Sequence, residues 1–365
     1  MNIIIEGIIF ELQSQGGISR MYQEILPRIC MQNDDVAINI VTAEPILQQL
    51  PLHQQIMHIQ LPSWPYRFIR PSRLLSGFRD FIRIESEIVK LASRKKSIWH
   101  ATYFIIPKQW NGPRIVSVYD LIYERFPNLF CLPEENKLRL QKRRAIINAD
   151  KVICISETTR RDVVEFYKIP EEKTQTIYLG YNSAFRQMPD PIDQKEKPFL
   201  LYVGTRVHYK NFLNLIKTYA KWKHNHEINL VVVGKPWSKE EIRNIEGLGL
   251  AKNVKIKINI TDSELCRLYN NAIVLVYPSL YEGFGVPLLE AFACGCPVIA
   301  SRIPSTQEII GNLAIYFDPL SIDSMQDALD NSLDLRHDPK YIQIANNFSW
   351  DRSAKEIFRL YQELL

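Results

Sequence analysis

The stretch YPSLYEGFGVPLLEAFACGCPVIAS, residues 277–301, decides how this chain is built. The apolar run 273–277 has the length and β-branched content of a buried strand, and Pro278 ends it. Pro287 is suited to the first turn of a helix because its missing N–H would have no partner there, and Gly295 ends that helix. Residues 297–300 predict the next buried strand. The stretch therefore predicts a strand, loop, helix and strand with a right-handed crossover, which is the repeating unit of a parallel α/β sheet.

The loop before the predicted helix carries two glycines and lies between two glutamates. Gly283 and Gly285 let the backbone approach a ligand closely and aim its N–H groups at it, as in anion sites at helix starts. Glu282 in the loop and Glu290 in the first turn of the helix do not bind phosphate, because carboxylates accept hydrogen bonds from hydroxyl groups instead. A sugar nucleotide carries hydroxyls on both sides of its diphosphate, so the pattern favours this class of ligand.

The same residues resemble a known family. Glu282 and Glu290 are separated by seven residues, GFG follows the first, and AFACGCPVIAS continues the match to the retaining glycosyltransferases of family four. The resemblance implies a GT-B fold, an α/β chain with two Rossmann-like domains facing a cleft and a C-terminal helix that crosses back to the first domain. It also implies that Glu282 holds the transferred sugar and Glu290 the ribose. The alternative is a buried α/β unit whose glutamates cap and solvate the helix start.

Further donor-binding candidates come from two strand-to-helix turns. The predicted strand 199–203 is followed by Arg206 and Lys210, and two cations beside a helix start favour a diphosphate, with a solvated pair of cations as the alternative. Gly17 lies between the first strand and the first helix, and the resemblance implies that such a glycine loop faces the donor diphosphate. The predicted donor-binding set is Gly17, Arg206, Lys210, Glu282, Gly283, Phe284, Gly285, Val286 and Glu290.

Two strand ends of the first domain supply the remaining catalytic candidates. Residues 98–101 and 114–120 predict short buried strands, and α/β sheets bind their ligands at strand ends. In the transferases that this chain resembles, a His-Asp pair follows the second strand and its histidine reaches the donor sugar; here that position is Tyr119. His100 lies at the end of the neighbouring strand. It either approaches the sugar from there or is a structural histidine whose hydrogen bonds are made within the protein. The predicted catalytic residues are Glu282, Tyr119 and His100.

Length and composition set the organisation of the chain. Its 365 residues predict two domains, since domains mostly run roughly 100 to 200 residues. We expect a first domain over 1–185, a second over 190–345, and a terminal helix at about 349–365 that joins the first. No run of about 18 apolar residues occurs and Met1 leads directly into a strand, which predicts a cytoplasmic protein. The six cysteines form no CxxC pair, and no metal site is predicted.

The net charge of +5 is concentrated locally. Residues 67–96 hold nine Lys and Arg against three Asp and Glu, and aromatic residues precede them. Residues 64–96 therefore predict an amphipathic basic helix that either contacts an anionic membrane surface or covers the core as a solvated helix. No nucleic-acid partner is expected. A second basic patch, typical of a solvated helix face, comprises Lys137, Arg139, Lys142, Arg143 and Arg144.

Together these features predict a retaining, metal-independent hexosyltransferase with no cofactor beyond its nucleotide-sugar donor. Family resemblance favours UDP-glucose or a similar UDP sugar, and a saccharide or lipid-linked saccharide acceptor in surface polysaccharide assembly at the inner face of the cytoplasmic membrane. One alternative, prompted by Tyr119, is a non-catalytic protein that binds sugar nucleotides or polysaccharide. The other is a glycoside hydrolase; a retaining hydrolase would need two carboxyl groups about 5 Å apart across the scissile bond.

Overall fold

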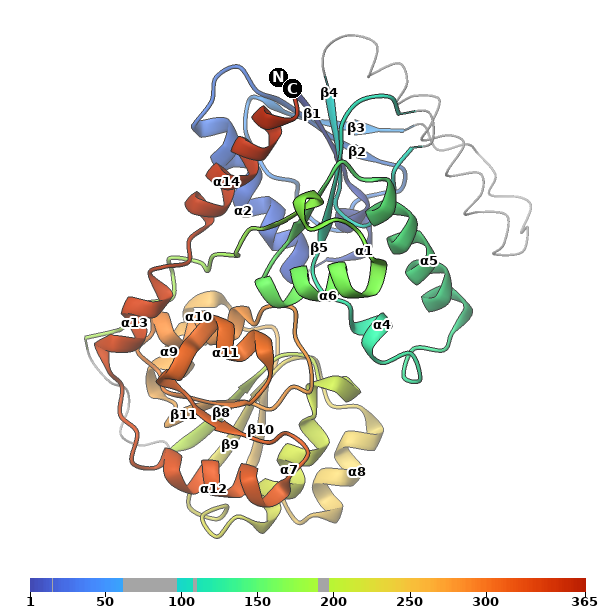
Figure 1. Ribbon diagram of the computed structural model, residues 1–365. Helices are drawn as coiled ribbons and strands as arrows, with labels where there is room; N and C mark the ends of the chain where they lie inside the picture. The colour runs from blue at the N-terminus through green and yellow to red at the C-terminus, as the bar shows by residue number, and fades with distance from the viewer. Residues whose placement is uncertain (15, 62–96, 108–109, 190–196) are drawn as a thin grey trace. The chain divides into compact units, whose positions relative to one another are not determined.

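The computed structural model describes residues 1–14, 16–61, 97–107, 110–189 and 197–365, and the predicted basic helix within 64–96 lies outside these ranges. The chain forms two compact units, one of residues 1–179 with 350–365 and one of residues 180–349 (Figure 1). The division after Leu179 falls a few residues before the boundary expected near 185 to 190. No helix in the described ranges is long and apolar enough to span a bilayer.

The first unit contains a sheet in which every paired strand is parallel, in the order β3-β2-β1-β4-β5-β6-β7. The chain adds strands on one side of β1, then returns to add the rest on the other side, so the order reverses between β1 and β4. Ligands of open α/β sheets bind outside the carboxyl ends of the strands at such a reversal. The strands are β1 Asn2–Glu6, β2 Ala37–Thr42, β3 Ile56–Gln60, β4 Ser97–Ala101, β5 Arg114–Val118, β6 Lys151–Cys154 and β7 Thr174–Thr176.

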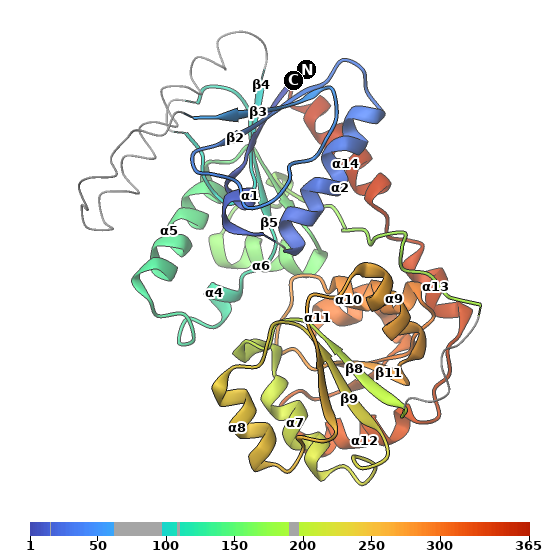
Figure 2. The same ribbon diagram turned by 180° about the vertical axis from the view of Figure 1, so that it is seen from behind.

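The terminal helix belongs to the first unit, where it packs against α2 (Figures 1 and 2). Both helices place apolar residues at i, i+3 and i+4 and bury them; Tyr22 of α2 and Tyr361 of the terminal helix are each at most 1% exposed. The pair of helices encloses polar side chains, among them His100, which contacts Tyr22 and Tyr361. The helices are α1 Ile8–Leu12, α2 Gly17–Met31, α4 Ile122–Arg125, α5 Pro133–Asn148, α6 Glu157–Tyr167 and α14 Trp350–Glu363, with a 3-10 turn at Glu171–Lys173.

The second unit contains another parallel sheet, in the order β10-β9-β8-β11-β12-β13. Its order reverses between β8 and β11. The strands are β8 Phe199–Val203, β9 Asn229–Val233, β10 Val254–Lys257, β11 Val274–Tyr277, β12 Val298–Ser301 and β13 Ile315–Phe317. The helices are α7 Phe212–Lys221, α8 Lys239–Gly247, α9 Asp262–Asn271, α10 Val286–Ala293, α11 Pro304–Ile310, α12 Ile322–Ser332 and α13 Pro339–Ala345, with 3-10 turns at His208–Lys210 and Gly311–Leu313. Two parallel-sheet, Rossmann-like units confirm the predicted fold class.

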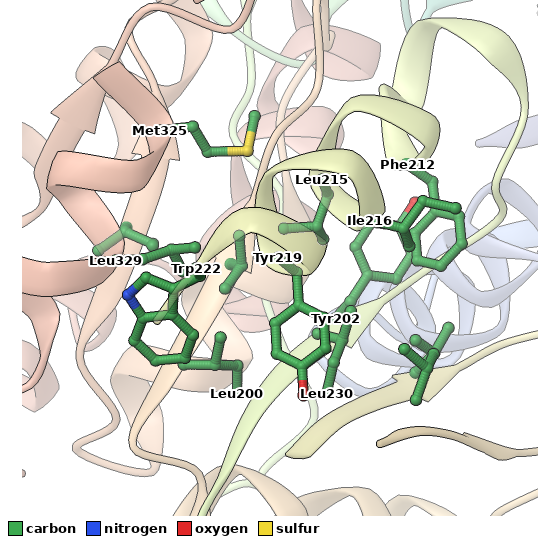
Figure 3. Close-up of a cluster of buried hydrophobic side chains, with 14 of the residues drawn as sticks. Leu200, Tyr202, Phe212, Leu215, Ile216, Tyr219, Trp222, Leu230, Met325 and Leu329 are labelled. Atoms are coloured by element: carbon green, nitrogen blue, oxygen red, sulfur yellow. The ribbon is translucent and has the colours of Figure 1, made fainter. Parts of the chain in front are cut away.

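A buried apolar cluster fixes β8 and the helix that follows it (Figure 3). The apolar face of α7 lies against β8 and β9 and against α12. The buried polar atoms of this cluster are satisfied: the Tyr219 hydroxyl donates to the Ile228 carbonyl at 2.6 Å, and the Trp222 indole donates to Asp330 at 2.8 Å. Because both ends of the connection are anchored, the loop between β8 and α7 has a defined position. Members of the cluster are Leu200, Tyr202, Phe212, Leu215, Ile216, Tyr219, Trp222, Leu230, Met325 and Leu329.

Candidate functional site

The candidate site lies in the second unit, where the sheet order reverses. The loops after β8 and β11 leave neighbouring strands at their carboxyl ends and contact each other there. The Leu280 N–H donates to the Tyr209 carbonyl at 2.7 Å, and Lys210 Nζ lies 2.5 Å from Glu282 Oε1. Two residues predicted separately, one from each loop, are thus brought into direct contact.

The Lys210–Glu282 ion pair is partly sheltered from water. The two side chains are 18% and 11% exposed. Lys210 Nζ also lies over the rings of Tyr209 and Tyr277, 5.4 and 5.9 Å from their centroids, where the aromatic faces attract a cation. Burial, and the Glu282 carboxylate to which its hydroxyl is hydrogen-bonded, raise the pKa of Tyr277 well above its usual value. Tyr277 therefore remains protonated and supports Glu282 from the strand end.

The glycine loop leads directly into α10. Gly285 has φ +112°, in the left-handed region, and a Cβ at this position would lie 2.8 Å from Leu288 Cδ1, so a side chain would disturb the first turn. Phe284 is buried and packs edge-on against Phe348, with ring centroids 5.9 Å apart. The loop is therefore rigid where Val286 begins the helix. Pro287 has no N–H and the Leu288 N–H donates to the Gly285 carbonyl at 2.9 Å, so the first turn of α10 presents the Val286 N–H and the positive end of the helix dipole, which suits an anion.

Glu290 occupies a different environment from Glu282. It is 6% exposed on α10, and its Oε2 accepts a hydrogen bond from the Tyr269 hydroxyl of α9 at 3.0 Å. Burial and, to a smaller extent, the Glu290 carboxylate raise the pKa of Tyr269 well above its usual value. The Tyr269 hydroxyl therefore keeps its proton and remains a hydrogen-bond donor. Glu290 is thus fixed by a buried tyrosine, whereas Glu282 is held by a cation. Its role at the ribose stays a prediction.

Arg206 makes its contacts with the neighbouring loop and not with Glu282. Its Nε lies 2.5 Å from Glu241 Oε1, and Nη2 donates to the carbonyl groups of Lys235 and Pro236. The guanidinium also lies over Trp237, 4.6 Å from the ring centroid. Nη1 is buried without a hydrogen-bond partner in the described part of the chain. The sequence predicted Arg206 but missed Glu241, whose detectable signal was only the capping pattern from Ser238, S-x-x-E.

His100 of the first unit is completely buried. Its Nδ1 lies 2.6 Å from the Tyr361 hydroxyl, and its Nε2 lies 2.8 Å from Ser117 Oγ and 3.4 Å from the Tyr22 hydroxyl. Burial lowers the pKa of His100 to about 3, so the imidazole is neutral at physiological pH. This placement agrees with the structural alternative for His100, in which it ties β4 to the terminal helix.

The other first-unit candidates differ in exposure. Tyr119 is 7% exposed; its hydroxyl donates to the Thr102 carbonyl at 2.8 Å and lies 3.0 Å from the Tyr22 hydroxyl. Gly17 is exposed at the first turn of α2, with no atom within 4 Å of the position a Cβ would take. The functional roles predicted for Tyr119 and Gly17 stay predictions.

Sequence reasoning missed Glu6, which ends β1 at the reversal of the first sheet. Its carboxyl group accepts the N–H groups of Tyr103 at 2.6 Å and Ile105 at 3.0 Å, and burial raises its pKa to about 8. The sequence feature that could have indicated Glu6 was an acidic residue at the end of the apolar run Ile3–Ile5. Glu6 fixes the course of the loop after β4. In the ranges that the structure describes, no three His, Cys, Asp or Glu side chains are grouped as a metal site would require.

Comparison with known proteins covers both units. Residues 185–347 match the family described as glycosyl transferases group 1, and residues 15–185 match glycosyltransferase family 4. The O-antigen chain mannosyltransferase RfbU of Salmonella typhimurium is 29% identical over 262 residues, 72% of this chain and 70% of its own. The O-antigen chain mannosyltransferase B of Escherichia coli is 23% identical over 390 residues, 95% of this chain and 96% of its own.

Solved structures share the fold over the whole chain. Sucrose-phosphate synthase from Thermosynechococcus elongatus superimposes with a TM-score of 0.77 at 19% identity, covering 100% of this chain and 98% of its own. WaaG, a glycosyltransferase involved in lipopolysaccharide biosynthesis, superimposes with a TM-score of 0.73 at 15% identity, covering 99% of each chain. At these identities the likeness establishes the fold alone.

Proposed function

This chain belongs to glycosyltransferase family 4 and has the GT-B fold, and on that premise we propose that it transfers a hexose from a nucleoside-diphosphate sugar to a saccharide acceptor. The observation that carries the proposal is the contact between Lys210 and Glu282 at the reversal of the second sheet. A cation suits the diphosphate and a carboxylate suits the sugar hydroxyls. The N-terminus of α10 beside them adds a second positive group for the phosphate oxygens.

In the proposed reaction, the bond between the anomeric carbon and the diphosphate breaks, and a bond from that carbon to an acceptor oxygen forms. Negative charge develops on the departing diphosphate, where Lys210 and the backbone N–H groups from Gly283 to Val286 would stabilise it. We propose retention of configuration by a front-face reaction, in which an oxygen of the leaving phosphate takes the proton of the acceptor hydroxyl. No protein nucleophile is assigned in this scheme.

Donor binding would redistribute the contacts of the ion pair. A diphosphate carries more negative charge than one carboxylate, so it would attract the Lys210 ammonium away from Glu282. Glu282, still supported by the Tyr277 hydroxyl, would then accept hydrogen bonds from the sugar. Glu290 would receive the ribose hydroxyls. Arg206 Nη1 is buried without a hydrogen-bond partner in the described residues, and the side chain would have to turn towards the donor to bind a phosphate oxygen.

The proposed acceptor is a saccharide or lipid-linked saccharide in surface polysaccharide biosynthesis at the inner face of the cytoplasmic membrane. Support comes from the two relatives named as O-antigen chain mannosyltransferases. Their names also introduce a mannose donor as a competitor of the UDP-glucose that the sequence resemblance favoured. The donor therefore has two candidate sugars, glucose and mannose.

A thermal-shift panel of UDP-glucose, GDP-mannose and ADP-glucose tests the proposal. A ligand at 100 times its dissociation constant stabilises the folded state by about 2.7 kcal/mol, which for a unit of this size raises the Tm by roughly 5 to 10 °C. We expect one donor to give this shift and Lys210→Met to abolish it. Lys252→Met, which changes an exposed lysine before β10, is the matched control and should retain the shift.

Two results, obtained when the panel is combined with assays of sugar transfer and of glycoside hydrolysis, would favour the alternative functions. Donor binding with no transfer to any acceptor would indicate a sugar-nucleotide-binding protein. Release of sugar from a simple glycoside, with no shift by any nucleotide sugar, would indicate a hydrolase and would contradict the proposed roles of Lys210 and Glu282.

A further inference from the structure

The first unit contains a cavity that the proposed donor site does not use. It has a volume of about 370 Å³ and lies between α4, α5 and α6. Small-ligand sites typically begin at roughly 300 Å³, so the cavity can hold a small group or the end of a larger molecule. Its walls include Glu124, Asn136, Arg139, Arg143, Phe166 and Tyr167.

Two arginines of α5 face this cavity without a carboxylate partner. Arg139 and Arg143 are four residues apart, which places them next to each other on one helix face, and like charges at this spacing repel. Arg139 donates to the Tyr123 carbonyl and to the Asn136 side chain. Arg143 makes no side-chain hydrogen bond or ion pair in the described ranges. The two guanidinium groups therefore keep hydrogen-bonding capacity for a ligand.

The carboxylate in the cavity wall is neutralised from the protein interior. Glu124 Oε2 lies 3.0 Å from Nζ of the buried Lys142, and Oε1 accepts the Tyr167 hydroxyl at 2.7 Å. Burial and the neighbouring Glu124 raise the pKa of Tyr167, so its hydroxyl remains a donor. Glu124 is thus paired with Lys142, and the charges of Arg139 and Arg143 are left uncompensated.

We propose that this cavity binds a phosphate or diphosphate group of the acceptor, an inference that rests on the proposed glycosyl transfer. Two adjacent guanidinium groups present N–H donors in the planar geometry that matches phosphate oxygens. Phe166, which is exposed at the cavity wall, offers an apolar surface for the part of the molecule attached to the phosphate. The helix α4 directly follows the carboxyl end of β5, the side of the sheet where α/β proteins bind ligands. Of the basic residues of α5, Arg139 and Arg143 thereby form a binding surface and not only a solvated face.

Arginine footprinting with inorganic pyrophosphate tests this site directly on the full chain. Phenylglyoxal modifies accessible arginines, and tandem mass spectrometry reports each residue separately. We expect pyrophosphate to slow the modification of Arg139 and Arg143 at least threefold. Arg144, an exposed neighbour on α5 outside the cavity wall, and the exposed Arg161 of α6 should react at unchanged rates. Equal rates at all four arginines with and without pyrophosphate would overturn the proposal.

Two further arms identify the source of the anion and separate this proposal from glycosyl transfer. Arg143→Gln should remove the protection of Arg139, whereas Arg144→Gln should preserve it. Protection by phosphatidylglycerol vesicles but not by pyrophosphate would identify a membrane-facing surface and contradict the phosphate site. Footprinting needs no donor, so the two proposals can fail separately. A normal donor-induced thermal shift without protection of Arg139 and Arg143 would support the proposed glycosyl transfer and contradict the proposed phosphate site in the cavity. Protection of the two arginines without any donor-induced shift would support the phosphate site and contradict the proposed glycosyl transfer.

Discussion

The buried His100 makes the stability of the first unit depend on pH in a predictable direction. Its pKa is about 3 in the folded protein and about 6.5 in an unfolded chain. Between these values the unfolded state binds more protons, so the folded state loses stability as the pH falls through this range. Integrating the difference from pH 7 to pH 5 gives a loss of about 2 kcal/mol.

Replacement of His100 by glutamine isolates this contribution. Glu6 acts in the opposite direction, because its raised pKa of about 8 makes the first unit less stable as the pH rises from about 4.5 to 8. The quantity to compare is therefore the change from pH 7 to pH 5 in the wild type and in His100→Gln. We expect the wild type to lose about 2 kcal/mol more than the variant.

Hydrogen exchange followed by mass spectrometry measures this difference locally. Peptides from β4 and α14 report the opening of the first unit, after correction for the intrinsic exchange rate at each pH, and peptides from β11 serve as an internal reference. Identical pH dependence in wild type and His100→Gln would refute the buried, neutral histidine. The same variant tests whether His100 has a catalytic role. A hundredfold loss of kcat with normal hydrogen-exchange protection of α14 would indicate that it does.

The remaining predictions concern single side chains. Glu282→Ala should abolish turnover, whereas Glu290→Ala should mainly weaken donor binding, by about 1.5–3 kcal/mol, and wild-type kinetics and donor affinity in both variants would contradict the assigned roles. Gly285→Ala should lower the Tm of the second unit and the donor-induced shift together, because φ +112° and the close leucine of α10 oppose a side chain; an unchanged Tm in calorimetry would contradict this. Lys142→Met should destabilise the first unit by about 3–5 kcal/mol in urea unfolding, because it leaves the buried Glu124 unpaired, and a loss below 1 kcal/mol would argue against that pair.

The local elements around the glycine loop were predictable because their signals are contiguous in the sequence. The strand expected at 273–277 is β11 at Val274–Tyr277, and the helix expected from Pro287 is α10 at Val286–Ala293. Apolar runs of strand length, a proline in the first helical turn and a glycine at the helix end each act within a few residues. The shared position of Lys210 and Glu282 also followed, because carboxyl ends of parallel strands meet at one edge.

The partners of the site residues were not predictable, because they depend on packing between distant segments. Arg206 and Glu241 are 35 residues apart, and their contact requires the loop after β9 to return beside β8. His100 and Tyr361 are 261 residues apart, and their contact exists only because α14 packs on the first unit. A single sequence contains the charge or hydroxyl of each residue but not the distance between them. The resemblance therefore located the family's histidine position at Tyr119, but it could not show that His100, the histidine on the neighbouring strand, is buried.

The Lys210–Glu282 pair shows why a contact of modest stability can still matter for function. An ion pair that is only 11–18% exposed gains little net stability, since the cost of removing both charges from water offsets most of their attraction. Its proposed functional effect comes from its position: the ammonium group and the carboxylate are held at the strand ends, already partly removed from water, with the rings of Tyr209 and Tyr277 beside Lys210. In the proposed reaction, a diphosphate sugar that binds there would exchange one anionic partner of Lys210 for another. Much of the cost of ordering and desolvating the site would then be met during folding, which would leave more of the donor's binding energy for stabilising the departing diphosphate.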